Sequence, residues 1–547
     1  MKNNKIGEGG RLFRNLAFSK LKKEPQSKIQ ITKGLLCAVL IVLQIIVILF
    51  WANEKAGFHH DEILTFQLSN DLEQPEKLTI SSKSDFLNQW HEAAYFVKVL
   101  PAQTGHVFDY AGVYEKQTHD VHPPLFYYGI HTLSSMFPGK FSKWLGIIPN
   151  IVYFIVTQIA IYAIGKRICK SEWFSLLLVA AYGFSTVAIS SVIFIRMYAL
   201  MTMWAVLAIY CHLRIYENCR KLRWYMLAGI CTFLGMNTQY YFVIFQFFVS
   251  ACCFLWLICS RHYKNALAYA ASISAGLGAT IWYWPAIIKH IFSGYRGTQA
   301  FDNLIGENNR LSGFLLRIGN MMANGWAAAI LFGLALLYVL ALVCKNRNDT
   351  ENDIGRISLV TMLVTVCGYT LIVTRVAPYT DIRYMMAVLP LLVICVLWGF
   401  WDALIRLVQK PGTVAAVLAV FVFIITLSTY RERRVEYLFQ NWKAETNAVE
   451  QYRNSNAVVI ADQTWKVAGT MLLHLSEHPQ SLIIHTDHID ELECEMENCT
   501  DGFVLYLEKG TQDEERLKEI ERMTASTAKM IFDRNGIFGI YYCSFNP

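Results

Sequence analysis

Charged residues are scarce in this chain, and their scarcity excludes a water-soluble protein of this size. Only 17% of the 547 residues are charged, 54% are hydrophobic and the mean hydropathy is +0.32. The apolar residues occur in long runs, which predict membrane helices because about 20 residues are needed to cross about 30 Å of hydrocarbon. The net charge of +7 does not indicate nucleic-acid binding, and its distribution along the chain is more informative.

Three sequence signals are missing, and each absence argues against one class of segment, site or protein. No small-residue cleavage site follows the first apolar run, 34–51, so an uncleaved anchor is favoured over a secretory signal peptide. No P-loop and no G-x-G-x-x-G after a strand marks a nucleotide site. No clear internal repeat is visible, although such repeats are common in transporters.

The apolar runs predict a polytopic, all-α membrane domain over residues 34–430. Eleven spans are expected at 34–51, 144–165, 173–193, 198–215, 224–240, 241–259, 265–290, 326–343, 357–375, 385–404 and 412–429. Residues 1–33 carry nine Lys or Arg and two acids, whereas 52–143 carries seven bases and eleven acids. The positive-inside rule therefore places the N-terminal segment 1–33 in the cytoplasm and the large loop 52–143 outside the plasma membrane.

Two segments of this large loop also have helical character. The short apolar stretch 122–137 would reverse all later loops if it spanned, so we expect a helix on the outer face that begins near Pro123 or Pro124. Residues 82–100 have apolar side chains at helical spacing, which predicts an amphipathic helix at the membrane interface. Packing of 82–100 against other parts of the loop is the alternative.

Residues 431–547 have a soluble composition and predict an extracytoplasmic α/β domain. Buried strands are expected at 456–462, 480–486 and 501–510, with helices at 464–475 and 513–523. Asn535-Gly536 between two apolar runs predicts a hairpin. Cys494 and Cys499 are close enough in sequence to allow a disulfide. The role of this domain stays open between structural support and acceptor binding.

An acidic pair, Asp61-Glu62, follows the first span by about ten residues and is flanked by His59 and His60. Two solvated acids on an outer loop would be the simplest explanation. However, the pair lies close to the membrane surface, and the same loop later presents the sequence DVHPPL, 120–125. Together these features favour a functional site.

Several arginines are expected on the same outer side, against the usual charge bias. Arg196 follows the third span, Arg296 lies in the loop 291–325, and Arg383 lies in the turn before a late span. Snorkelling at the interface is one explanation. The other is a cationic cluster that holds a phosphate, because the planar guanidinium group binds phosphate through two hydrogen bonds.

Carboxylates and guanidinium groups at one membrane surface could transfer a sugar from a lipid phosphate. A carboxylate would take the proton of an acceptor hydroxyl that attacks the anomeric carbon, which typically contributes about 10²–10⁴ in rate. The cations would stabilise the leaving phosphate. Attack opposite to the leaving group would invert the anomeric centre.

The motifs themselves resemble a known family. The acidic pair, DVHPPL, RMYAL (196–200) and Arg383-Tyr384 are similar to motifs of the GT-C glycosyltransferases, within the family 39 group of protein O-mannosyltransferases and bacterial aminoarabinose transferases. The resemblance covers roughly 34–404. It implies a polyprenyl- or dolichyl-phosphate sugar donor and identifies Asp61 as the base, with Glu62 beside it. Relatives often carry Arg at the head of the next span, where this sequence has Lys143.

The sequence therefore predicts a membrane glycosyltransferase, a hexosyl or pentosyl transferase whose acceptor is a protein, a glycolipid or a cell-wall polymer. A transporter or lipid flippase is the alternative. A divalent metal also stays open as a cofactor, although the spacing of His59, His60, His119 and His122 matches no zinc signature. The expected site residues are Asp61 and Glu62 for catalysis; His122, Arg196, Tyr198, Arg296, Arg383 and Tyr384 for the donor phosphate; and His60, Asp120, Gln239 and Tyr240 for the acceptor pocket.

Overall fold

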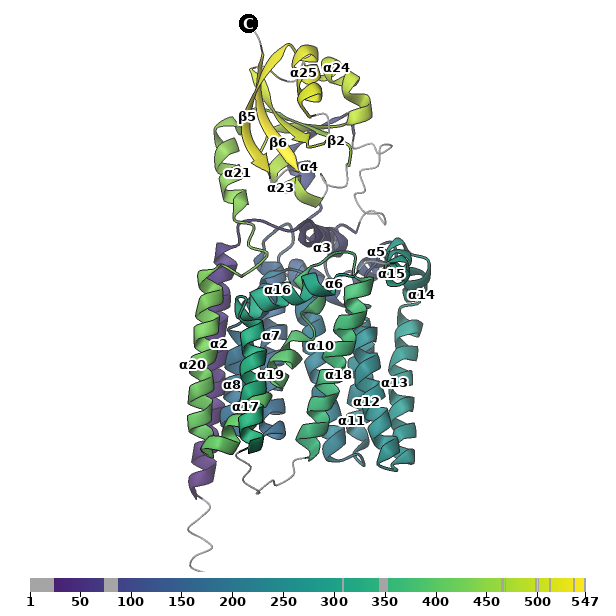
Figure 1. The fold of residues 1–547 in the computed structure, drawn as a ribbon. Helices are drawn as coiled ribbons and strands as arrows, with labels where there is room; N and C mark the ends of the chain where they lie inside the picture. Colours follow the sequence, from purple (N-terminus) through teal and green to yellow (C-terminus); the bar gives the residue numbers. More distant parts are fainter. Residues whose placement is uncertain are drawn as a thin grey trace, which may run out of the picture.

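The computed structural model has a helical bundle with a smaller sheet-containing domain at one of its ends (Figure 1). It describes residues 24–72, 87–306, 309–343, 353–463, 467, 469–496, 499, 501–510, 513–534 and 537–545. Most of the predicted basic segment 1–33 thus lies outside the described residues. We refer to the end of the bundle that faces the smaller domain as the site end.

All eleven predicted spans are helical in the structure. The helices are α2 (Glu24–Glu54), α7 (Trp144–Ile168), α8 (Glu172–Gly183) with α9 (Thr186–Ile193), α10 (Tyr198–Glu217), α11 (Leu222–Met236), α12 (Phe242–Cys259), α13 (Tyr263–Tyr283), α17 (Ala327–Val343), α18 (Asp353–Val376), α19 (Leu389–Val408) and α20 (Pro411–Arg431). Among the described residues, seven helices are long and apolar enough to cross a membrane, and α8 with α9 form an eighth candidate bent by 56°. The count of eleven therefore stays a prediction.

The first span shows how the bundle is suited to lipid. Side chains on the outer face of α2, such as Val42 and Ile46, are more than half exposed, as expected for a helix that faces hydrocarbon. The polar Gln44 points inward instead and is fully buried. Its amide nitrogen donates a hydrogen bond of 2.9 Å to the carbonyl oxygen of Val179 in α8. The amide nitrogen is thus satisfied inside the protein, which a low-dielectric surrounding favours.

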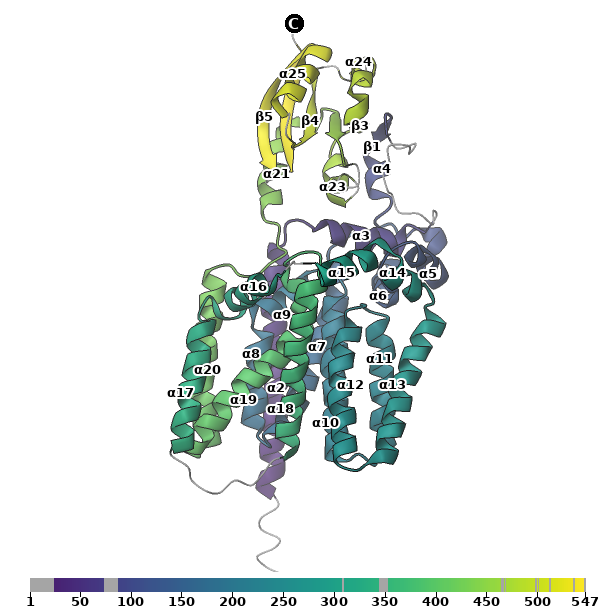
Figure 2. The ribbon, with the colours of Figure 1, turned by 45° about the vertical axis from the view of Figure 1, so that its right-hand side comes forward.

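Short helices lie across the site end of the bundle (Figure 2). They are α3 (His60–Asn70), α5 (Tyr110–Thr118), α6 (Leu125–Ser135), α14 (Ala286–Phe292), α15 (Tyr295–Ile305), α16 (Leu311–Ala323) and the 3₁₀ turn η2 (Ile382–Met385). Helix α6 has 11 residues, so it rises only about 16 Å and is too short to span. The prediction of a short helix within 122–137 is confirmed, and Pro124 is its N-cap. Its place on the outer face of the membrane stays a prediction.

The smaller domain contains a six-stranded sheet in the order β1-β3-β2-β4-β6-β5. The predicted strands are confirmed as β2 (Ala457–Ala461), β3 (Gln480–His485) and β4 (Gly502–Glu508), which pair in parallel. Strands β5 (Ser526–Arg534) and β6 (Phe538–Phe545) form the expected hairpin, although Asn535-Gly536 lies outside the described residues. The flanking helices are α21 (Asn441–Val449), α23 (Leu472–Leu475), α24 (Leu492–Glu495) and α25 (Asp513–Met523).

The prediction of an amphipathic helix at 82–100 is wrong for residues 87–100. Residues 82–86 lie outside the part of the chain that the structure describes. Residues Trp90–Glu92 form strand β1, followed by the five-residue helix α4 (Ala93–Val97). Strand β1 pairs antiparallel with β3, so a segment of the large loop completes the sheet of the C-terminal domain. Backbone pairing at an open sheet edge overrode the helical spacing of its side chains.

The structure contains no disulfide between Cys494 and Cys499. Cys494 is an exposed free thiol and Cys499 is a buried one, so the disulfide that their spacing allows is not formed. Burial raises the pKa of the Cys499 thiol to about 11. This cysteine behaves as a small apolar residue of the domain core.

Candidate active site

A cavity of about 360 Å³ opens at the site end of the bundle. Its volume falls in the range of about 300–1,000 Å³ that is typical of small-molecule sites. All predicted site residues line it except His60 and Glu62. The lining members are Asp61, Asp120, His122, Arg196, Tyr198, Gln239, Tyr240, Arg296, Arg383 and Tyr384. The fold therefore brings together residues from α3, η2, α10, α15 and the turns between spans.

The first turn of α3 places Asp61 at the cavity. His59 is the N-cap, and its Nδ1 accepts a hydrogen bond of 3.1 Å from the Asp61 backbone N–H. The Glu62 carboxylate accepts a 2.7 Å hydrogen bond from the His59 N–H, which completes a capping box. The Asp61 side chain itself takes no part in the cap. Its carboxylate is therefore free to face other side chains near the positive end of the helix.

Glu62 does not line the cavity beside Asp61, which differs from the placement expected for a catalytic pair. Its side chain is fully buried and lies 2.9 Å from the Nζ of Lys55, which is also fully buried. The second Glu62 oxygen accepts a 2.8 Å hydrogen bond from the backbone N–H of Ile195. Consecutive residues at the start of a helix point in different directions, so only one acid of the pair could reach the cavity. Glu62 anchors α3, and Asp61 stands alone as the carboxylate of this turn.

Two arginines surround Asp61. Arg383 Nη1 donates a hydrogen bond to Asp61 Oδ2, and Arg196 Nη1 donates one of 3.3 Å to the Asp61 carbonyl oxygen. Burial alone would raise the pKa of Asp61, but the Arg196 and Arg383 guanidinium groups hold it well below its usual range. The carboxyl group is therefore ionised at neutral pH.

A hydrogen-bond chain orients Arg196 from behind. His122 Nε2 lies 3.1 Å from Arg196 Nη2, and His122 Nδ1 lies 2.7 Å from Asp120 Oδ2. Arginine can only donate, so His122 accepts through Nε2 and carries its proton on Nδ1, from which it donates to Asp120. Burial, followed by the nearby Arg196, lowers the pKa of His122 and keeps the ring neutral. Asp120 and His122 of the DVHPPL motif thus hold the Arg196 side chain in its orientation.

A second series of hydrogen bonds holds Tyr240, which also lines the cavity. His290 Nε2 lies 3.3 Å from the Thr118 carbonyl oxygen and must donate to it, so His290 Nδ1 accepts the 2.8 Å hydrogen bond from the Tyr240 hydroxyl. Trp284 Nε1 donates to the same hydroxyl at 2.9 Å. His290 lines the cavity but was not predicted, because it ends a predicted apolar span and belongs to no motif.

The cavity also has an apolar wall. Leu64 and Leu68 of α3, Val243 and Ile244 of α12, Phe301 and Leu304 of α15, and Ile372 and Val376 of α18 contribute to it. Phe301 and Leu304 are each almost half exposed on the surface of α15. The polar and apolar walls together suit an amphiphilic ligand with a charged head.

Other predicted residues lie elsewhere. Lys143 does not replace a cavity arginine, since its Nζ donates to the backbone carbonyl oxygens of Asn53 and Lys55 at 3.2 Å and 2.7 Å. His60 does not line the cavity, and its Nε2 lies 3.3 Å from Asp61 Oδ1. His119 is exposed beside Glu115, so it belongs to no cluster with the other histidines.

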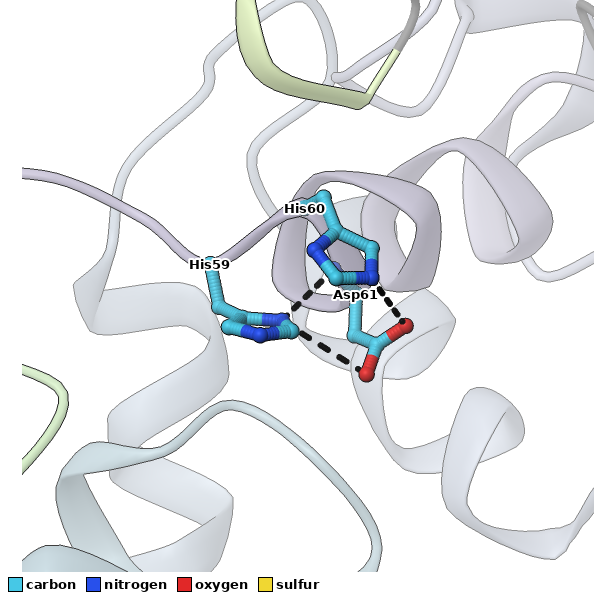
Figure 3. A group of neighbouring side chains, drawn as sticks. All are labelled: His59, His60 and Asp61. Carbon is cyan, nitrogen blue, oxygen red and sulfur yellow. Dashed lines mark hydrogen bonds and ion pairs between the residues drawn. The ribbon is translucent and has the colours of Figure 1, made fainter. Parts of the chain in front are cut away.

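The histidines beside Asp61 raise the question of a metal. One ligand atom each from His59, His60 and Asp61 lies within 4.8 Å of the others (Figure 3). This donor set suits zinc in type. However, Arg383 and Arg196 contact Asp61 and would repel a divalent cation, and His59 Nδ1 already accepts the Asp61 N–H. The three residues therefore do not fit a metal ion.

Comparison with known proteins gives the fold. A family model described as dolichyl-phosphate-mannose-protein mannosyltransferase matches residues 121–284. The crystal structure of ArnT from Cupriavidus metallidurans bound to undecaprenyl phosphate matches with a TM-score of 0.50 and 9% identity, over 92% of this chain and 97% of that chain. The chain has the fold of the GT-C glycosyltransferases. A comparison with the curated proteins finds no match.

Two further solved structures resemble this chain. ArnT from the same organism in the apo state matches at a TM-score of 0.48 and 9% identity, over 92% of this chain and 97% of that one. The oligosaccharyltransferase of Archaeoglobus fulgidus in complex with zinc and sulfate matches with a TM-score of 0.42 and 10% identity. The match covers 88% of this chain and 73% of that chain. The segment matched by the family model includes His122, Arg196 and Tyr240 but neither Asp61 nor Arg383.

Proposed function

We propose that this GT-C protein transfers a sugar from a polyprenyl-phosphate donor to an acceptor hydroxyl at the outer face of the plasma membrane. The observation that carries the proposal is the shared cavity, which Asp61, Arg196, Arg296 and Arg383 all line together with an apolar wall. A charged sugar phosphate would lie among the arginines, and its lipid chain would follow the apolar side.

The arginines are suited to a phosphate. Arg196 and Arg383 are 3% and 6% exposed, and the Nε of each has no hydrogen-bond partner among the described residues. Phosphate oxygens form charge-assisted hydrogen bonds with guanidinium groups, and these bonds are stronger where water is largely excluded. The ArnT structure of the same fold is bound to undecaprenyl phosphate, which supports a polyprenyl phosphate as the carrier.

Asp61 serves as the general base in this proposal. It takes the proton of the acceptor hydroxyl while the oxygen attacks the anomeric carbon, and the bond between that carbon and the phosphate oxygen breaks with inversion. The proton ends on Asp61 and the electron pair on the lipid phosphate, whose charge the guanidinium groups stabilise. A bound donor phosphate would also compete for Arg383, and loss of that ion pair would make Asp61 a stronger base.

The placement of the charges favours a transferase over a transporter. Asp61, Arg196 and Arg383 come from a short helix and from connections at the site end, not from the middle of spanning helices. Transporters more often hold charges at midplane in broken helices. Neutral sugars and amino sugars, and protein, glycolipid and polymer acceptors, all stay compatible with this site.

Mass spectrometry of glycans and lipids from cells with and without the protein tests the proposal. We expect one sugar linkage to disappear from cells without the protein, to return with the wild-type chain, and to stay absent with Asp61→Asn. Restoration of the linkage by Asp61→Asn would contradict the assignment of the base. Unchanged glycans and lipids in cells without the protein would contradict sugar transfer itself.

A further inference from the structure

A strained segment connects the bundle to the C-terminal domain. We call residues 432–440, between α20 and α21, the strap. Tyr437 and Phe439 of the strap have positive φ angles of 66° and 49°. Such angles cost bulky residues on the order of 1–3 kcal/mol each and persist only where the surroundings hold them. They therefore mark a segment whose exact path matters.

The strap is held from both sides. Lys55 Nζ donates a hydrogen bond of 2.7 Å to the Tyr437 carbonyl oxygen. The Ala56 N–H donates one of 2.8 Å to the Leu438 carbonyl oxygen. Arg317 Nη2 lies 2.8 Å from both carboxylate oxygens of Glu436. Since Lys55 also pairs with Glu62 in the first turn of α3, the strap is bonded to the same cation that anchors the Asp61 helix.

The Tyr437 side chain reaches from the strap towards the cavity arginines. Its ring stacks on Phe194 with centroids 4.0 Å apart and planes 12° apart. Its hydroxyl donates a 2.6 Å hydrogen bond to Asp381 Oδ1. Tyr437 is 9% exposed, so this hydrogen bond is made largely out of water, where a lost partner is costly.

Asp381 transmits this contact to Arg383. Its Oδ1 also accepts the backbone N–H of Arg383 at 3.1 Å, as the N-cap of η2, and its Oδ2 lies 3.6 Å from Arg383 Nε. The other end of the Arg383 guanidinium group contacts Asp61. One continuous series of polar contacts thus runs from Tyr437 through Asp381 and Arg383 to Asp61.

We propose that Tyr437 is a positioning residue whose hydroxyl, acting through Asp381, aims the Arg383 guanidinium group at Asp61 and at the donor phosphate. The inference rests on the proposed function and adds a role for the strap that leads to the C-terminal domain. Tyr437 itself does not line the donor cavity, so it acts only through the two residues that follow it in the series.

Binding of a polyprenyl phosphate to the purified full chain in detergent micelles tests this role. The key variant is Tyr437→Phe, which keeps the ring that stacks on Phe194 and removes only the hydroxyl. Tyr430→Phe is a matched control because the Tyr430 hydroxyl donates 2.6 Å to the Phe184 carbonyl oxygen, away from the cavity. Arg383→Ala reports the loss of the phosphate contact, and melting temperatures report folding.

We expect Tyr437→Phe to weaken polyprenyl phosphate binding about tenfold, the effect of losing one hydrogen bond to a charged group, while Tyr430→Phe binds as the wild type. Asp381→Asn should weaken binding as well, and the double variant Tyr437→Phe, Asp381→Asn should be no weaker than Asp381→Asn alone. The two residues would then act through one series of contacts.

Tyr437→Phe with wild-type affinity, while Arg383→Ala binds weakly, would overturn the positioning role and leave the proposed function intact. Equal weakening by Tyr437→Phe and Tyr430→Phe would also overturn it, because the effect would then be general destabilisation. A wild-type chain that binds no polyprenyl phosphate would instead refute the proposed function, and the inference with it.

Discussion

Replacement of Asp61 by Asn should separate donor binding from sugar transfer. The substitution keeps the shape of the side chain and removes its charge. The fold should tolerate it, because the hydrogen bonds that hold residue 61 in α3 use its backbone: the N–H donates to His59 Nδ1, and the carbonyl oxygen accepts from Thr65 Oγ1 at 2.8 Å and from Arg196. The carboxylate pairs with Arg383 and lies 3.3 Å from His60 Nε2, and the variant loses the charge in both contacts.

Transfer should fall by about 10²–10⁴, the usual contribution of a general base. Binding of polyprenyl phosphate should become tighter instead, because Arg383 is released and a negative charge beside the phosphate is removed. Two like charges about 5 Å apart repel by roughly 3 kcal/mol at an effective dielectric constant of about 20. The Asp61 side chain is 21% exposed, so solvent and salt reduce this energy, and we expect about tenfold tighter binding.

The assay is equilibrium binding of polyprenyl phosphate, alongside turnover with membrane extracts that supply the sugar donor. Asp402→Asn is a suitable control, since Asp402 pairs with Arg406 at 3.1 Å within α19 and does not line the cavity. Weaker binding by Asp61→Asn would refute the competition between Asp61 and the phosphate for Arg383. Full turnover by Asp61→Asn would refute its role as the base.

Three further predictions concern the supports of the site. Lys55→Met should destabilise the chain by about 3 kcal/mol, measured as a lower melting temperature, because it leaves the Glu62 charge buried without a partner; adding Glu62→Gln should recover part of the loss. Burial raises the pKa of Glu445 to about 7, above its unfolded value, so the stability due to its protonated form is lost as the pH rises through 7. The melting temperature of the wild type should thus fall relative to that of Glu445→Gln as the pH rises from about 4.5 to about 7 and level off above it, and parallel curves would contradict this shift. EDTA should leave transfer unchanged, because two guanidinium groups contact Asp61; loss of transfer that zinc restores would show that the histidines hold a metal.

The sequence predicted much of the fold because local patterns carry it. Runs of apolar residues gave helices at every expected span, and short apolar strands with a hairpin signal predicted the sheet. The segment 82–100 failed, because its strand β1 depends on an edge supplied by β3, almost 400 residues away in the chain. Pairing of this kind leaves no local signature.

The candidate site divides in the same way. Residue type and position within the loops were enough to single out Asp61, Arg196 and Arg383, which the structure brings to one cavity. The sequence could not separate the roles of Asp61 and Glu62, because two adjacent acids have no local feature that distinguishes them. Only the structure shows that Glu62 forms a buried ion pair with Lys55.

The sequence by itself determined which segments are apolar enough for a membrane, where the charges lie between them, and that a soluble α/β segment follows. Only the tertiary structure decided that Arg383 meets Asp61 across 322 residues, and that Tyr437 reaches Asp381 from the strap. Hydropathy is a property of neighbours in the chain, whereas an ion pair depends on where two distant backbones are held, and that placement is set by the packing of the whole bundle.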